Sequence, residues 1–189
     1  RPDPLQLAYV LQVRAEVHRA GGWLDEALRA SRAYLALARQ LGDMTLIASG
    51  LDSVGSVRRR LGHRGPALRL LTTSVVFKRR TGNRYGEAAS LNELALLHGE
   101  EGRHAAAVAR HEQALAMMRD MADRHGELAI LNDLGRTLRR AGDLDGAADL
   151  HRQVLDATER FDAPFRRADA YDGLAHCVLE RDGEAARRH

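Results

Sequence analysis

Apolar residues recur along this chain in columns whose members lie 40 positions apart. One column of large side chains consists of Leu11, Leu51, Leu91, Leu131 and Tyr171. A second column contains only glycine, at Gly22, Gly62, Gly102 and Gly142. A third contains only alanine, five residues after each glycine, at Ala27, Ala67, Ala107 and Ala147. Columns that share one register indicate internal repeats, so the chain is read as copies of a 40-residue unit.

Each repeat is expected to form two helices. In the second repeat, Ile47, Leu51 and Val54 follow the i, i+4, i+7 spacing of an amphipathic helix. Glycine at the next boundary ends that helix in a left-handed conformation, and Gly42 followed by Asp43 supplies a stop and an N-cap one helix earlier. A second helix is predicted over 64–80. Its inward residues are expected to be Ala67, Leu68, Leu71, Val75 and Val76.

Small residues recur on the first helix of each repeat, where paired helices need to approach closely. They are Gly55, Ala95, Gly135 and Ala175. Glycines and prolines are too few for an all-β fold, and alanine, leucine, arginine and glutamate favour helix almost everywhere. The predicted fold class is therefore all-α, built from antiparallel helix hairpins.

The pattern L-x-x-[VL]-[GA]-x6-G-x4-A, seen at Leu91, Leu94, Ala95, Gly102 and Ala107, resembles the tetratricopeptide repeat. The resemblance covers essentially the whole chain and implies a right-handed superhelical solenoid of about four and a half repeats. The 40-residue period is similar to that of G-protein signalling modulators, kinesin light chains and actinobacterial regulatory proteins. The arginine-rich composition fits the last group best.

The repeats are expected over 3–42, 43–82, 83–122 and 123–162, with a partial repeat over 163–189. Together they would form a single domain over 1–189, a fragment of a longer protein. Residues 184–189 are expected to begin the second helix of the partial repeat. The missing remainder would leave the helix around Ala168–Leu179 uncovered, so a homodimer is one expected outcome.

Charge and cysteine content narrow the class of protein. The 29 basic and 26 acidic residues interleave and give a net charge of only +3, so a nucleic-acid partner is disfavoured. The single cysteine, Cys177, fits a reducing compartment and a buried position. No apolar run reaches the ~20 residues of a membrane span, and a cytoplasmic location is expected.

No catalytic or phosphate-binding motif occurs in the chain, so an enzyme is not expected and no cofactor is assigned. The nine histidines contain no pair at the i, i+4 spacing of helical zinc sites, so no metal is assigned. His111 and His151, at equivalent repeat positions, are expected to be packing residues.

A polar column follows the large apolar column by one residue, and consists of Gln12, Asp52, Asn92, Asn132 and Asp172. The resemblance implies that this column lines the concave groove. There an amide could pair with the N–H and C=O of a bound peptide, because it both donates and accepts. Alternatively, these side chains form hydrogen bonds with groups of neighbouring helices and bind no partner.

Arginines follow on the same face, at Arg19, Arg59, Arg60, Arg136, Arg139 and Arg140. They could bind carboxylates, or simply be favoured near helix C-termini. The partner-binding residues predicted from both groups are Gln12, Asp52, Asn92, Asn132, Asp172, Arg59, Arg136 and Arg139.

The leading functional hypothesis is a protein–protein interaction module that binds an extended peptide or a partner helix in its concave groove. The alternative is the sensor or oligomerisation arm of a bacterial transcriptional regulator. Such an arm would act through other domains of its own protein or through self-association.

Overall fold

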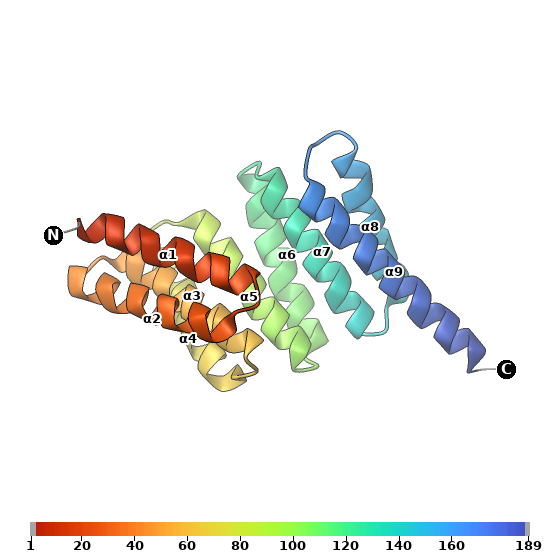
Figure 1. Ribbon diagram of the computed structural model, residues 1–189. Helices are drawn as coiled ribbons and strands as arrows, with labels where there is room; N and C mark the ends of the chain where they lie inside the picture. The colour runs from red at the N-terminus through yellow and green to blue at the C-terminus, as the bar shows by residue number, and fades with distance from the viewer. Residues whose placement is uncertain (1–2, 188–189) are drawn as a thin grey trace. The chain divides into compact units, whose positions relative to one another are not determined.

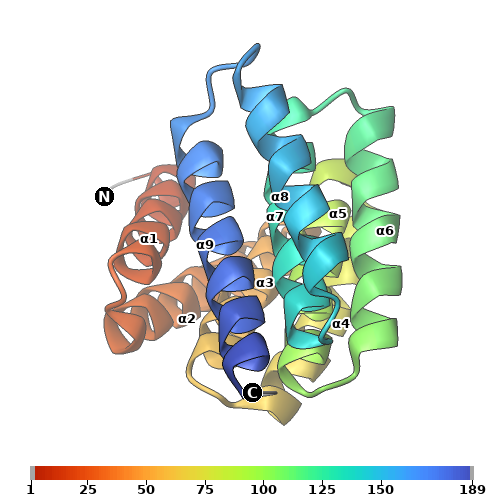
Figure 2. The same ribbon diagram turned by 90° about the vertical axis from the view of Figure 1, so that its right-hand side faces the viewer.

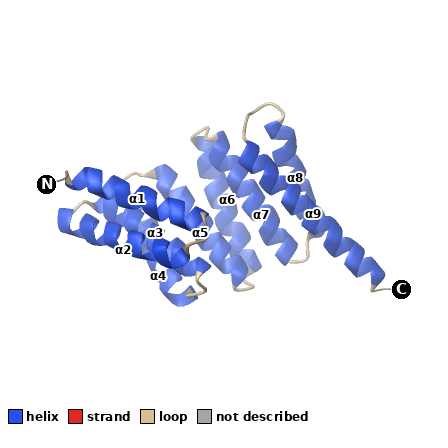
Figure 3. Cartoon of the chain, in the orientation of Figure 1, coloured by secondary structure: helices blue, strands red, loops and turns tan. Residues whose placement is uncertain are grey.

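The computed structural model describes residues 3–187, and almost all of them are helical (Figure 1). The described residues contain no strand (Figure 3). The helices in chain order are α1 (Pro4–Ala20), α2 (Leu24–Leu41), α3 (Met44–Arg60), α4 (Arg64–Arg80), α5 (Arg84–Glu100), α6 (His104–Asp120), α7 (Arg124–Arg140), α8 (Leu144–Thr158) and α9 (Pro164–Ala186).

The helix ends follow the sequence signals. The helix predicted over 64–80 is α4. Gly42 and Gly62 adopt φ values of 69° and 78°, a left-handed conformation that favours glycine, and they end α2 and α3 as expected. The Asp43 carboxylate accepts hydrogen bonds from the backbone N–H groups of Thr45 and Leu46 and so caps α3.

The structure consists of two compact units, and the division falls between Leu97 and His98 in the last turn of α5. In unit 1, second helices pack between neighbouring first helices around a core that includes Leu35, Leu51 and Val57. In unit 2, α7, α8 and α9 lie side by side (Figure 2), and Ala147, Ala148 and Cys177 form a buried cluster between α8 and α9.

Small residues allow close helix contacts in both units. A Cβ atom at Gly55 of α3 would lie 2.9 Å from side-chain carbons of Leu71 in α4. In unit 2, a Cβ at Gly135 of α7 would lie 2.8 Å from the imidazole ring of His151 in α8. Each second helix therefore packs directly against the backbone of its own first helix.

Two sequence expectations are wrong in detail. Val76 was expected to face inward, but 41% of its surface is exposed, whereas Lys78 two residues later is only 4% exposed. The expected helix start near residue 184 does not occur, because α9 continues without a break to Ala186. None of the helices among the described residues is long and apolar enough to cross a membrane.

Candidate protein-binding site

The first helices of unit 1 lie next to one another and carry the polar column on one side. The guanidinium of Arg60 in α3 donates to the carbonyl oxygen of Arg19 at the end of α1. Arg59 of α3 forms an ion pair with Glu93 of α5, with Nε 3.0 Å from Oε2. These arginines therefore join neighbouring first helices, and Arg59, predicted to bind a partner, is already paired with a carboxylate.

Asp52 belongs to a polar cluster that lies mostly between the helices. The Lys78 ammonium of α4 lies 3.2 Å from the Asp52 carboxylate and donates to the Ser90 hydroxyl of α5 at 2.8 Å. Ser90 donates in turn to Asp52. The hydroxyl of Ser74 continues the network, 3.1 Å from Ser90, and donates to the carbonyl of Ala48 at 2.9 Å.

This cluster alters the acidity of Asp52. Burial raises the pKa of the Asp52 carboxyl above its usual range, and the ammonium of Lys78 opposes that change. Since the lysine is buried as well, the pair joins α3 to α4 and is poorly placed to bind a partner by its charge.

Asn132 departs most from the prediction that the polar column lines an open groove. It is only 2% exposed. Its amide donates to the carbonyl of Arg166 in α9 at 2.9 Å, and its carbonyl oxygen lies 3.0 Å from Nδ1 of His151 in α8. The side chain is enclosed by three helices of unit 2 and forms hydrogen bonds with two of them. This is the alternative that the sequence left open.

The arginines predicted in unit 2 are also paired within the chain. Arg136 forms an ion pair with Asp133, one turn earlier on α7. Arg139 forms an ion pair with Glu180 of α9. Both pairs are partly exposed, and the second of them ties α7 to α9.

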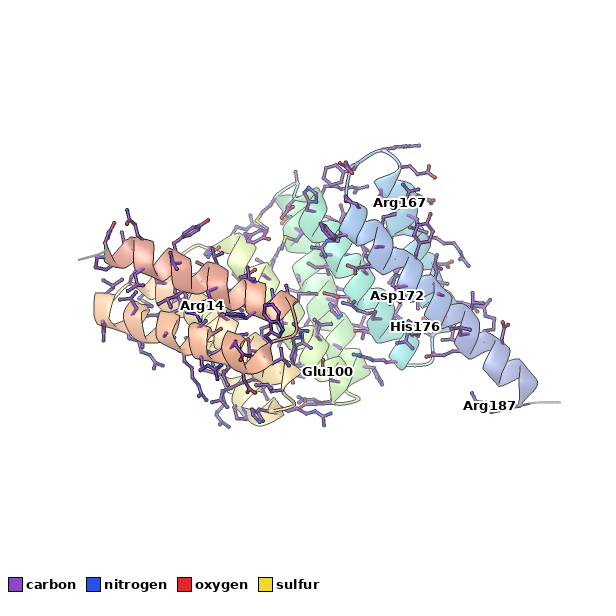
Figure 4. All side chains as sticks on the ribbon, viewed as in Figure 1. Arg14, Glu100, Arg167, Asp172, His176 and Arg187 are labelled. Carbon is purple, nitrogen blue, oxygen red and sulfur yellow. The ribbon has the colours of Figure 1, made fainter. Side chains whose placement is uncertain are left out.

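The remaining members of the polar column differ in exposure. Gln12 is exposed, whereas Asn92 is partly buried and has an interaction within the chain. Asp172 is exposed, and its carboxylate lies 3.7 Å from Nε2 of His176, one turn later on α9 (Figure 4). In the polar column, Gln12 and Asp172 are therefore exposed, whereas Asp52 and Asn132 join neighbouring helices.

The two equivalent histidines are packing residues, as expected. His111 and His151 are both 0% exposed. His111 Nε2 lies 3.0 Å from the hydroxyl of Thr137, and burial lowers the pKa of His111 to about 3. Burial also lowers the pKa of His151. Both rings are therefore neutral at pH 7. Cys177 is buried as expected, which raises the pKa of its thiol.

Exposed aromatic residues were missed by the sequence analysis. Of eight aromatic residues, five are more than half exposed: Tyr9 (68%), Trp23 (58%), Tyr85 (58%), Phe165 (82%) and Tyr171 (54%). The repeat register could have revealed some of them. Leu5, Tyr85 and Phe165 occupy the same repeat position, on the polar side of the first helices.

Helical spacing places Tyr9 near Gln12 on α1 and Tyr85 near Asn92 on α5. Residues three and four positions apart share a helix face, so Leu5, Tyr9 and Gln12 lie together on α1. Tyr85 and Asn92 are seven residues apart and share the equivalent face of α5. We call this surface, formed by Leu5, Tyr9, Gln12, Tyr85 and Asn92, the first-helix surface of unit 1.

Comparison with protein families identifies the repeat. Residues 86–160 match the sequence profile of the tetratricopeptide repeat. The resemblance drawn from the sequence is therefore confirmed. No curated protein sequence matches the chain.

Solved structures extend the same fold over the rest of the chain. Kinesin light chain TPR-like repeats from Podosopora anserina match with a TM-score of 0.70 and 19% identity, covering 100% of this chain and 92% of that one. BtubC (BKLC) from P. vanneervenii matches with a TM-score of 0.67 and 18% identity, covering 87% of this chain and 68% of that one.

A Rap protein, solved in complex with Competence and Sporulation Factor, has a TM-score of 0.82 and 14% identity. The match covers 96% of this chain and 55% of the Rap chain. These likenesses confirm the fold class, an all-α solenoid of tetratricopeptide-type hairpins. Stacked repeats of this kind create extended surfaces suited to binding.

Proposed function

We propose that this chain is a protein-interaction module that binds an extended polypeptide segment across the first-helix surface of unit 1. The observation that carries the proposal is the exposure of Tyr9 and Tyr85, at 68% and 58%, on a surface that also presents amides. Tyrosine contributes a large contact area with little loss of conformational entropy, and it is enriched among the residues that dominate binding energy.

The spacing of the two tyrosines suits an extended chain. They lie on α1 and α5, which are separated by α3, and packed helices are about 8–10 Å apart. The anchors are therefore on the order of 20 Å apart along the surface. An extended peptide rises ~3.3 Å per residue. The two peptide residues that contact the tyrosines would therefore be about six positions apart in the peptide sequence.

The amides of Gln12 and Asn92 give this surface a means of binding the peptide backbone. Each amide can donate to a carbonyl and accept from an N–H whatever the peptide's side chains are. The Arg59–Glu93 ion pair and the Arg60 hydrogen bond to Arg19 join the first helices. A surface with its helices already joined loses less entropy on binding than a mobile one.

The Rap protein of similar fold is complexed with Competence and Sporulation Factor, which supports a binding role for this fold. The alternative expected from the sequence, a sensor or oligomerisation arm of a bacterial regulator, stays a prediction. A cytoplasmic location likewise stays a prediction.

The proposal is tested by selecting peptides from a random-peptide display library against the whole chain. The affinity of the best peptide is then measured by calorimetry for Tyr9→Ala and Tyr85→Ala. Each variant is expected to weaken binding by about tenfold or more, since truncating an aromatic anchor costs at least 1–2 kcal/mol.

Trp23→Ala is the matched control, because Trp23 is an equally exposed aromatic of unit 1 at the α1–α2 turn, where it packs edge-on against His18. Unchanged affinity in both tyrosine variants, or an equal loss in the Trp23 variant, would contradict the proposed surface.

A further inference from the structure

Helix α9 exposes a face that is buried in the three preceding first helices. The repeat positions concerned are the sixth, ninth and thirteenth. They are buried at Ala48, Leu51 and Gly55, at Ala88, Leu91 and Ala95, and at Leu128, Leu131 and Gly135. In α9 the same positions are Ala168, Tyr171 and Ala175, and all three are exposed.

The cause is visible in the other repeats. There the thirteenth position contacts the second helix of its own hairpin, as Gly55 contacts Leu71 of α4 and Gly135 contacts His151 of α8. Within unit 2, α9 packs on α7 and α8 through its opposite side, which includes Gly173 and Cys177 (Figures 1 and 2). Among the described residues of unit 2, no helix covers the face that carries Tyr171.

The residues along this face have a spacing that reads the same in both directions. Arg167, Tyr171, Val178 and Asp182 are separated by 4, 7 and 4 positions, so they follow one side of the helix. All four are exposed. We call them the α9 seam. Its midpoint lies between Leu174 and Ala175.

The two ends of the seam carry opposite charges that are not paired within unit 2. Among the described residues, Arg167 approaches only the ring of Tyr171, with its guanidinium carbon 6.0 Å from the centroid, and Asp182 forms no ion pair. Neighbouring charges are paired inside the unit, such as Arg181 with Asp145. The free charges therefore mark the ends of the apolar stretch.

We infer that α9 is covered by α9 of a second copy of this chain, packed antiparallel about a two-fold axis at Leu174–Ala175. This arrangement places Arg167 opposite Asp182 of the second copy and Tyr171 opposite Val178 of the second copy, and the symmetry forms each contact twice. The exposed alanines at 168 and 175 let the two helices approach closely. The inference is independent of peptide binding, which uses unit 1.

The test is the oligomeric state of the whole chain, measured by sedimentation velocity over a concentration series. The wild-type chain is expected to form a dimer. Arg167→Asp and Asp182→Arg each place like charges in contact twice, so each is expected to raise the dimer dissociation constant by about tenfold. Val178→Asp buries a charge in the seam and is expected to leave only monomer.

The double variant R167D/D182R discriminates the arrangement, because it restores both opposite-charge contacts only if the helices are antiparallel. It is expected to dimerise as the wild type does. Arg32→Asp, a charge reversal at an exposed position of α2, is the matched control and is expected to change nothing. Helicity by circular dichroism verifies that each variant folds.

Three results would overturn the inference. The first is a wild-type chain that stays monomeric at the highest concentration, which would leave the face to a helix from another protein. The second is a dimer insensitive to the seam variants but lost in Val13→Asp, which would move the interface to the exposed apolar stripe of α1 that contains Val10, Val13 and Val17. The third is a double variant that remains as weak as the single ones.

Discussion

Lys78, the only lysine of the chain, lies 3.2 Å from the carboxylate of Asp52 and is 4% exposed. Two charges removed from water in this way stabilise a fold only as a pair, because each one alone would be an uncompensated charge. The contact joins α4 to α3, and through Ser90 it extends to α5. Asp52, which was predicted to bind a partner, is thus part of the helix packing of unit 1.

Replacing Lys78 with methionine is expected to destabilise the chain by about 3–5 kcal/mol, because the Asp52 carboxylate loses its counter-charge. The free energy of unfolding is measured by urea titration followed by circular dichroism. The double variant D52N/K78M removes both charges and is expected to recover a large part of the loss. A single variant as stable as the wild type would show that the pair is not needed for stability.

Asn132→Ala is expected to lower the free energy of unfolding by about 1–3 kcal/mol, since it leaves Nδ1 of the buried His151 without its hydrogen-bond partner and removes a side-chain hydrogen bond to α9. The matched variant is Asn92→Ala, at the equivalent and more exposed repeat position, where a cost below about 1 kcal/mol is expected. Thermal unfolding of the two variants distinguishes them. Equal losses at both positions would mean that burial does not separate the roles of these amides.

The buried histidines are expected to make the chain less stable in weak acid. Burial lowers the pKa of His111 to about 3 in the folded chain, whereas an unfolded histidine titrates near 6.5. Between these values only the unfolded chain binds the proton, so stability falls as the pH falls below about 6.5.

From pH 7 to pH 5, His111 alone accounts for a loss of about 2 kcal/mol. His111→Gln should remove that share of the pH dependence when urea titrations at the two pH values are compared. The same pH dependence in the variant and the wild type would contradict the assignment.

The hairpins were predictable because they depend on local signals repeated in register. Gly62 and Asp43 acted as the stop and the cap that their residue types favour, and the helix predicted over 64–80 is α4. Lys78 shows the limit of this approach. Its burial instead of Val76 depends on a counter-charge from another helix, which no pattern within 64–80 contains.

The candidate site was predictable as a face but not residue by residue. The repeat register places Gln12, Asp52, Asn92 and Asn132 at equivalent positions of the first helices. Whether such a side chain is open or enclosed depends on the neighbouring helices. Asn132 is enclosed because Gly135 and Gly173 allow the His151 ring to approach it. Gln12, at the equivalent position of α1, is exposed.

The most direct test of the proposed function is amide NMR mapping of the whole chain with and without a selected peptide. The account predicts that the largest chemical-shift changes fall on Tyr9, Gln12, Tyr85 and Asn92, and that α2 and α4 are little affected. Changes confined to α2 and α4, with none on these four residues, would contradict it.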